Sequence, residues 1–180
     1  MKQLTIAKIV YLLLFWAGPN VIEGTLYAQE IKESQYLYSP GGEPAKVTLG
    51  VVENVVLRPW GVSFPARIDT GADLSSLDAR DIVVRNNIAE FKLGKRYGGL
   101  QLQVPVVDWR HIQTSMGIEK RPVVVMLICL GSKLLRTPVT LKDRSEMMYP
   151  FLVGRSALNG VFLVDSSQSN TAQPVCSATF

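Results

Sequence analysis

The chain has 180 residues, of which 47% are hydrophobic, and carries 19 Lys and Arg against 15 Asp and Glu. This length predicts one domain with additional terminal segments, and the apolar fraction excludes a wholly disordered chain. A net charge of +4 without a basic stripe argues against nucleic acid as the partner. One His and two Cys argue against a zinc enzyme.

The N-terminus has the pattern of an export signal over residues 1–28. Two lysines accompany an uninterrupted apolar run at 9–17, which is too short to span a bilayer comfortably. Ala28 is the candidate cleavage point, although Leu26 is a poor match to the small residue that cleavage requires. We therefore expect export to the periplasm or cell envelope. The sequence leaves open whether the segment is cleaved or stays as a membrane anchor.

The middle of the chain predicts strands. Residues 29–45 contain Pro-Gly-Gly and a further Pro, which indicates a loose linker or arm before a folded domain at 46–165. Short strands separated by turn residues are typical of an all-β barrel or sandwich. The strands are expected at 46–57, 62–68, 82–85, 89–93, 100–107, 122–130, 134–141 and 161–164.

One short helix and a tail complete the predicted elements. Residues 155–159 form a single helical turn, and Gly160 ends it. Residues 166–180 are rich in Ser, Thr, Gln and Asn, which bury too little surface to offset the entropy of ordering, so a flexible tail is expected. Cys129 lies in an apolar run and Cys176 in the tail. Export would permit a disulfide between them, and the sequence leaves that pairing open.

Two segments carry chemistry. Residues 69–73, Asp-Thr-Gly-Ala-Asp, follow directly on the predicted strand 62–68. By itself this segment is compatible with an ordinary turn, because Asp and Gly are common turn residues. Residues 151–155, Phe-Leu-Val-Gly-Arg, bring an apolar run up to a Gly at the start of the predicted helix.

Together the two segments resemble the retropepsin-like aspartic peptidases, whose catalytic loop has the pattern Asp-Thr/Ser-Gly-Ala and whose domain ends with two hydrophobic residues and a Gly before a short helix. The chain resembles one bacterial branch in particular, historically labelled ATP-dependent zinc proteases and often discussed beside enzymes that add glutamate tails to proteins. The likeness covers residues 48–166. Its matching segments are 66–72, 75–79, 121–123, 141–147, 152–155 and 162–165. Asp73 departs from the branch, whose members often have a basic residue there.

The resemblance implies a small closed acid-protease barrel, all β with one short C-terminal helix. It also implies that the carboxylates of two Asp69 residues share a proton and activate a water between them. Each chain has one Asp-Thr-Gly, so the second carboxylate must come from a second copy. A symmetric homodimer, which brings each loop against its twin, is therefore expected, with a peptide or protein as substrate.

Neighbouring residues have supporting roles under the same resemblance. Gly71 permits a tight turn, and Ala72 leaves room for the substrate. The hydroxyl of Thr70 donates across the dimer axis. Asp73 and Arg155 are expected to form a bracing ion pair, as in the retroviral enzymes; the alternative is that both are solvated surface charges.

A mobile hairpin is expected to cover the cleft and exclude water. Residues 108–120 are the candidate segment, and Trp109, Met116 and Gly117 are its candidates for substrate contact. An ordinary exposed loop is the alternative. A further hairpin is expected within residues 86–107. The cleft is expected to be apolar and to bind an extended substrate.

No cofactor is expected. The chain lacks the G-x-x-x-x-G-K-[ST] loop that holds nucleotide phosphates, and its His111, Cys129 and Cys176 are too scattered for a zinc site. The sequence thus predicts an exported, homodimeric aspartic endopeptidase that holds no metal. Two alternatives remain: a latent or catalytically inactive binding module of the same fold, and a metal-dependent peptidase, as the historical label has it.

Overall fold

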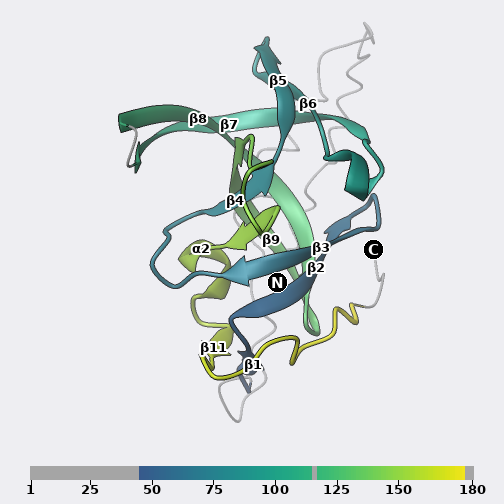
Figure 1. Ribbon diagram of the computed structural model, residues 1–180, viewed down its shortest axis with the longest axis vertical. Helices are drawn as coiled ribbons and strands as arrows, with labels where there is room; N and C mark the ends of the chain where they lie inside the picture. The colour runs from purple at the N-terminus through teal and green to yellow at the C-terminus, as the bar shows by residue number, and fades with distance from the viewer. Residues whose placement is uncertain (1–44, 115–116, 177–180) are drawn as a thin grey trace, which may run out of the picture. The chain divides into compact units, whose positions relative to one another are not determined.

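The computed structural model describes residues 45–114 and 117–176, and almost all of them lie in strands or connecting turns (Figure 1). Helix is confined to two short segments in this part of the chain, which confirms the all-β class. The elements are β1 (Val47–Leu49), β2 (Val52–Arg58), β3 (Val62–Ile68), β4 (Ser75–Asp78), β5 (Arg80–Arg85), β6 (Ile88–Lys92), η2 (Lys95–Tyr97), β7 (Gln101–Thr114), β8 (Gly117–Leu130), β9 (Lys133–Lys142), β10 (Phe151–Val153), α2 (Arg155–Leu158) and β11 (Phe162–Val164).

The expected signal segment at 1–28 and almost all of the expected arm at 29–45 lie outside the described residues. Among the residues that are described, no helix is long and apolar enough to cross a membrane.

Nine strands form one sheet in the order β2-β3-β10-β4-β9-β8-β7-β6-β5. β2 also pairs with β8, so the six strands β2, β3, β10, β4, β9 and β8 form a closed ring of pairings. β7, β6 and β5 continue outward from this ring, as Figure 1 shows. β1 and β11 pair in parallel as a separate two-stranded sheet.

The inward side chains of the ring form the core. Val55 and Leu57 of β2 alternate with half-buried residues, and neither has any exposed surface. Phe64 of β3 and Phe151 of β10 are also fully buried, with ring centroids 6.2 Å apart. Each such side chain contributes about 1.5–3 kcal/mol of hydrophobic free energy. This packing holds β3 and β10, whose ends carry the candidate site, side by side in parallel register.

Two hairpins differ in extent from the sequence expectation. The additional hairpin is β5–β6, which begins at Arg80 and turns at Asn86 and Asn87, both with positive φ (49° and 59°) as a tight hairpin turn requires. The hairpin expected at 108–120 is the outer end of the longer β7–β8 hairpin, whose strands stay paired up to Thr114 opposite Gly117. Few of the outer side chains of this hairpin reach the core, so their polar sequence resembles that of a loop.

The tail that composition predicts to be flexible packs along the start of β2. The amide of Val51 donates to the carbonyl of Gln168 (2.8 Å), and the amide of Asn170 donates to the carbonyl of Val52 (2.7 Å). A Cβ on Gly50 would lie 2.4 Å from the Gln168 oxygen. This close approach therefore requires glycine at position 50.

A buried carboxylate and a disulfide hold the rest of the described tail. Glu53 has no exposed surface. Its Oε1 accepts hydrogen bonds from the amide and hydroxyl of Thr171 (3.0 and 2.6 Å), and its Oε2 accepts one from the amide of Ala172 (3.0 Å). Cys176 is joined to Cys129 of β8 by a disulfide, the pairing that the sequence leaves open. The prediction from composition considers only the apolar area that a segment can bury. It therefore does not anticipate a tail that is ordered by hydrogen bonds to a buried carboxylate and by a disulfide.

Candidate active site

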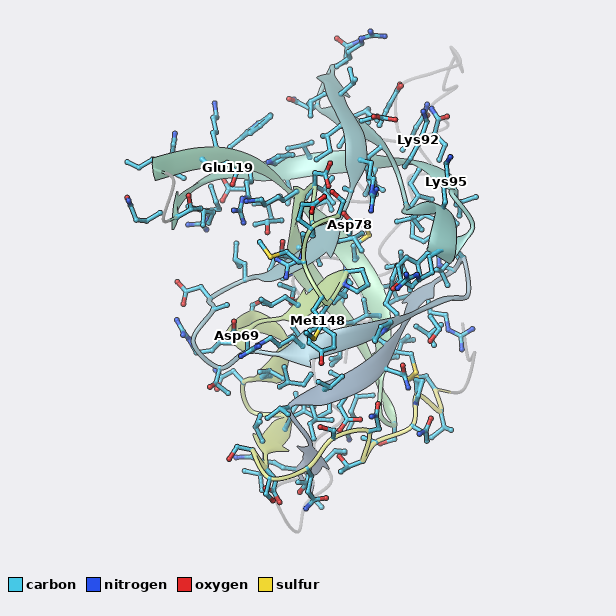
Figure 2. The ribbon with its side chains drawn as sticks, in the orientation of Figure 1. Asp69, Asp78, Lys92, Lys95, Glu119 and Met148 are labelled. Carbon is cyan, nitrogen blue, oxygen red and sulfur yellow. A yellow bond between two sulfur atoms is a disulfide. The ribbon has the colours of Figure 1, made fainter. Side chains whose placement is uncertain are left out.

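Asp69 lies directly after β3, at the tip of that strand (Figure 2). Its backbone amide donates to the carbonyl of Val153 in the neighbouring β10 (2.9 Å). Its Oδ1 accepts hydrogen bonds from the amides of Gly71 (2.9 Å) and Ala72 (3.2 Å). A Cβ on Gly71 would lie 3.2 Å from that same oxygen, which is tight. The loop thus fixes the orientation of the carboxyl group, and glycine leaves room for it.

Gly154, at the end of β10, lets the second segment approach this loop. A Cβ on Gly154 would lie 2.5 Å from the carbonyl carbon and oxygen of Leu74, so any larger residue would collide with backbone. The Gly154 amide donates to the Ser75 hydroxyl (3.2 Å). One residue on, the amide of Arg155 donates to the carbonyl of Ala72 (2.8 Å). The first turn of α2 is therefore hydrogen-bonded to the loop that carries Asp69.

The Arg155 side chain spans the same loop. Its Nη1 donates to the carbonyls of Thr70 (2.9 Å) and Gly71 (2.8 Å), and its Nη2 donates to the carboxylate of Asp73. The ion pair between Asp73 and Arg155 that the resemblance implies is present. A surface ion pair alone contributes little to stability, but here one guanidinium binds three acceptors of a single loop.

A cavity of about 1400 Å³ adjoins this loop. Residues 70–73 form one wall, and residues 110–113 of the β7–β8 hairpin line it from another element. Apolar residues such as Leu74, Ile112 and Leu152 line it together with four arginines: Arg110, Arg121, Arg144 and Arg155. Three of these arginines bind carboxylates, those of Asp108, Glu119 and Asp73 respectively for Arg110, Arg121 and Arg155, and Arg144 has no such ion pair among the described residues.

Arg144 and Arg121 are the most enclosed of these cations. Arg121 is 9% exposed and binds Glu119 (2.6 Å). Burial and the nearby charge of Arg121 lower the pKa of Arg144, while Asp78 and Asp69 act in the opposite direction. The guanidinium of Arg144 donates to the carbonyl of Tyr149 (3.3 Å). Arg144 is thus close enough to Asp69 for the two charges to interact.

Two buried hydroxyl residues also line the cavity. Ser76 and Thr140 face each other across the β4–β9 pairing and are 5% and 2% exposed. The Thr140 hydroxyl donates to the carbonyl of Ser75 (3.1 Å), whereas the Ser76 hydroxyl has no hydrogen-bond partner in the described part of the chain. A buried hydroxyl without a partner is costly, so a polar group of a ligand would stabilise it.

Sequence reasoning assigned no role to Ser76, Arg121, Thr140 or Arg144. Ser76, Arg121 and Arg144 lie in segments that carry the family resemblance (75–79, 121–123 and 141–147). This resemblance was the feature of the sequence that could have pointed to them. Their convergence depends on three strands and a loop meeting at one cavity, which spacing along the chain does not reveal.

The covering hairpin is only partly as expected. Trp109 does not line the cavity; it lines a separate hollow, with the Lys120 ammonium 4.8 Å from its ring centroid. Met116 lies outside the described residues. Gly117 has φ of +120°, and its carbonyl accepts a hydrogen bond from the Thr114 hydroxyl (2.9 Å). Among the residues described, no group of three or more His, Cys, Asp or Glu side chains is placed to hold a metal ion.

Comparison with known proteins agrees with this site. The model of the RimB-like family, described as retropepsin-like aspartic endopeptidase RimB, matches residues 48–174. The chain belongs to the RimB-like family. The matched range includes both the Asp69 loop and the Gly154-Arg155 segment, as well as most of the docked tail.

Relatives in two groups support the assignment. A probable alpha-L-glutamate ligase from Shewanella halifaxensis is 37% identical over 134 residues, and one from Parasynechococcus marenigrum is 31% identical over 135 residues. The matches cover 69% of this chain but only 29% of either ligase, so the chain spans less than a third of these relatives. The crystal structure of Lpg0085 from Legionella pneumophila, a protein described as of unknown function, has a TM-score of 0.61 and 30% identity, covering 71% of this chain and 98% of that one.

Proposed function

We propose that this chain is an aspartic endopeptidase that works as a homodimer. The observation that supports it is the Asp69 carboxyl group, held by the amides of Gly71 and Ala72 in a loop that Arg155 braces and whose residues 70–73 line a large cavity. Two carboxylates are needed for this chemistry, and the chain has one Asp-Thr-Gly. A twofold axis beside the loop would supply the second from another copy.

In this mechanism the two Asp69 carboxyl groups hold one proton between them, because two close negative charges repel. The ionised group takes a proton from water as the water attacks the scissile carbonyl. The protonated group donates to the carbonyl oxygen, which gives a neutral tetrahedral intermediate. As this intermediate collapses, the C–N bond breaks, one carboxyl group passes its proton to the leaving nitrogen, and the other takes a hydroxyl proton, so the pair again holds one proton. Thr70 is exposed beside Asp69 and is free to donate to the partner loop across the axis. The β7–β8 hairpin would exclude bulk water.

The substrate that fits the cavity is a peptide with carboxylate side chains. Arg144 offers charge-assisted hydrogen bonds, and the unpartnered Ser76 hydroxyl offers one more donor. The relatives named as probable alpha-L-glutamate ligases carry a segment similar to this chain, which agrees with a glutamate-containing substrate. The proposed reaction uses two carboxyl groups and a water molecule, and it requires neither a metal nor a nucleotide.

We also propose that the protein acts outside the cytoplasm. The Cys129–Cys176 disulfide forms and persists in oxidising compartments, such as the periplasm. The apolar run at residues 9–17 is the export signal or membrane anchor under this proposal.

The test compares wild type, Asp69→Asn and Glu90→Gln on a peptide library rich in Glu, with the mass of each protein measured in solution. Glu90 supplies a matched change from carboxylate to amide on β6, away from the cavity. We expect a dimer whose cleavage is lost in Asp69→Asn and retained in Glu90→Gln.

Cleavage by Asp69→Asn at the wild-type rate would refute the proposal. A protein that binds these peptides but never cleaves them would instead be the inactive binding module. Activity should also survive exhaustive chelation. Loss on chelation, restored by zinc, would identify a metal-dependent peptidase.

A further inference from the structure

A second hollow, of about 700 Å³, lies between η2 and the loop at residues 143–150. Its size is within the usual range of ligand pockets and far exceeds that of a single small ion. In Figure 2, Lys92 and Lys95 lie to one side and Asp69 to the other, with Met148 between them in this view. The proposed catalysis uses none of the η2 residues that line this hollow.

The hollow has an excess of positive charge. Five basic residues line it against two acidic ones, Asp78 and Asp81. Both acids are already paired: Asp78 binds Arg80 (3.1 Å) and Asp81 binds Lys92 (3.0 Å). Asp78 raises the pKa of Arg80, and Asp143 and Glu146 of the nearby loop add smaller effects in the same direction; neither Asp143 nor Glu146 lines the hollow.

Lys95, Arg96 and Arg144 are the remaining cations. Lys95 and Arg96 are adjacent, exposed residues of η2, and neither has an ion-pair partner within residues 45–114 and 117–176. Arg144 is partly buried, and burial lowers its pKa. A ligand carboxylate would therefore meet two exposed cations without an ion-pair partner in the described residues, Lys95 and Arg96, beside Arg144, whose charge interacts with those of Asp78 and Asp69.

The apolar lining favours polypeptide over nucleic acid. Met147 and Met148 are 53% and 84% exposed at the rim, and methionine side chains adapt to irregular apolar partners. The aromatic residue of the hollow, Tyr97, packs against Phe64 with ring centroids 4.7 Å apart and a tilt of 45°, which occupies part of its ring surface. Several separated cations with a methionine rim suit an extended acidic segment rather than one phosphate group.

Arg144 also connects this hollow to the catalytic cavity, because its side chain lines both. A chain bound along η2 can therefore continue past the 143–150 loop toward the Asp69 loop. We propose that the hollow between η2 and the 143–150 loop is a second binding site, which takes an acidic, extended segment of a polypeptide. The proposed binding is argued from the charges of this hollow alone. That a bound chain is also cleaved at the Asp69 loop rests on the proposed function.

The test measures binding without cleavage. A fluorescein-labelled octapeptide of glutamate and its glutamine counterpart are titrated into the full chain carrying Asp69→Asn, and fluorescence anisotropy is recorded. The key variant is Lys95→Glu/Arg96→Glu. The matched control is Arg85→Glu/Arg136→Glu, which changes the net charge equally at exposed sites that line neither cavity. Lys95→Gln/Arg96→Gln is the milder second variant.

We expect the acidic peptide to bind at least about 10-fold more tightly than the glutamine peptide. The key variant should weaken that binding by about 10-fold or more, and the control by less than about 2-fold. The amide NMR signals of Gly98 and Gly99, directly after η2, should shift with the peptide and cease to shift in the key variant.

Three results would overturn the inference. The first is an equal loss in the key and control variants, which would mean unspecific attraction by net charge. The second is that the Gly98 and Gly99 signals remain unmoved while those of residues 70–73 shift, which would confine binding to the catalytic cavity. The third is that inorganic phosphate or an oligonucleotide displaces the peptide at comparable concentration. Because Asp69→Asn is the background throughout, failure of catalysis would leave all three readouts intact.

Discussion

Replacing Glu53 with Gln tests whether one buried carboxylate organises the end of the chain. Glu53 has no exposed surface, and its Oε1 accepts from the Gly50 amide (2.6 Å) and from two donors of Thr171. Its Oε2 accepts from the Ala172 amide (3.0 Å). The glutamine oxygen would take the side with three donors, so its NH₂ group would face the Ala172 N–H.

The expected loss follows from these contacts. A buried amide of Ala172 without an acceptor costs about 1–3 kcal/mol, and each bond that changes from a charged to a neutral acceptor weakens by about 1 kcal/mol. With three bonds at Oε1 and one at Oε2, we expect the free energy of unfolding to fall by about 4–6 kcal/mol, a large share of the roughly 5–15 kcal/mol that stabilises a domain. Urea unfolding measures this loss, and amide exchange at residues 168–172 shows where it arises.

The effect also depends on pH. Burial raises the pKa of Glu53, but hydrogen bonds from Thr171, Gly50 and Ala172 lower it by more, so the net pKa lies below the ordinary 4.5. The carboxylate therefore stabilises the fold fully above pH 4.5, and this contribution is lost as the pH falls toward the lower folded value. The difference in the free energy of unfolding between wild type and Glu53→Gln should therefore become smaller as the pH falls below 4.5.

Glu90→Gln is the control, with an expected change of under about 0.5 kcal/mol. A loss of less than about 1 kcal/mol in Glu53→Gln, with unchanged amide exchange in the tail, would refute the reasoning.

Three further perturbations test the site and the tail. Gly154→Ala should lower the free energy of unfolding by about 3 kcal/mol, because the new Cβ meets the Leu74 backbone at 2.5 Å; a change under about 1 kcal/mol in urea would contradict this. Arg155→Lys should cut kcat by about 10-fold or more with little loss of stability, since one ammonium cannot reproduce the fork of a guanidinium; unchanged turnover would rule out a bracing role. Replacing Cys129 and Cys176 by Ser should lower the free energy of unfolding by about 4 kcal/mol, given the 47-residue separation of the two cysteines. Adding a reductant to the wild-type protein should lower it by the same amount in the same urea assay.

The central strands and the chemical core of the site were predictable from sequence. β3 has the predicted bounds, Val62–Ile68, because its alternating apolar residues face one buried side. The ion pair between Asp73 and Arg155 was predicted from the resemblance to a known loop and helix, and the structure contains it. β4, by contrast, is a short run of Ser, Ser, Leu and Asp, all buried, and neither its length nor its composition indicates a strand.

What sequence missed has a common physical origin. Glu53 in mid-strand has the composition of a surface position, yet it is fully buried because the tail supplies donors more than a hundred residues away. The charge of the cavity comes from arginines of several elements, and each of them alone resembles an exposed cation. Such features depend on contacts between distant segments, and local patterns do not encode them.

The hydrogen bonds between the Asp69 loop and α2 have a consequence for biosynthesis. Asp69 is made early, but Arg155, which braces its loop and lies 82 residues after Asp73, is added only after all six ring strands. A ribosome-bound fragment that stops before position 151 would carry the aspartate without β10, whose carbonyl binds the Asp69 amide. The loop therefore gains the hydrogen bonds that fix its conformation only after β10 and α2 have been synthesised.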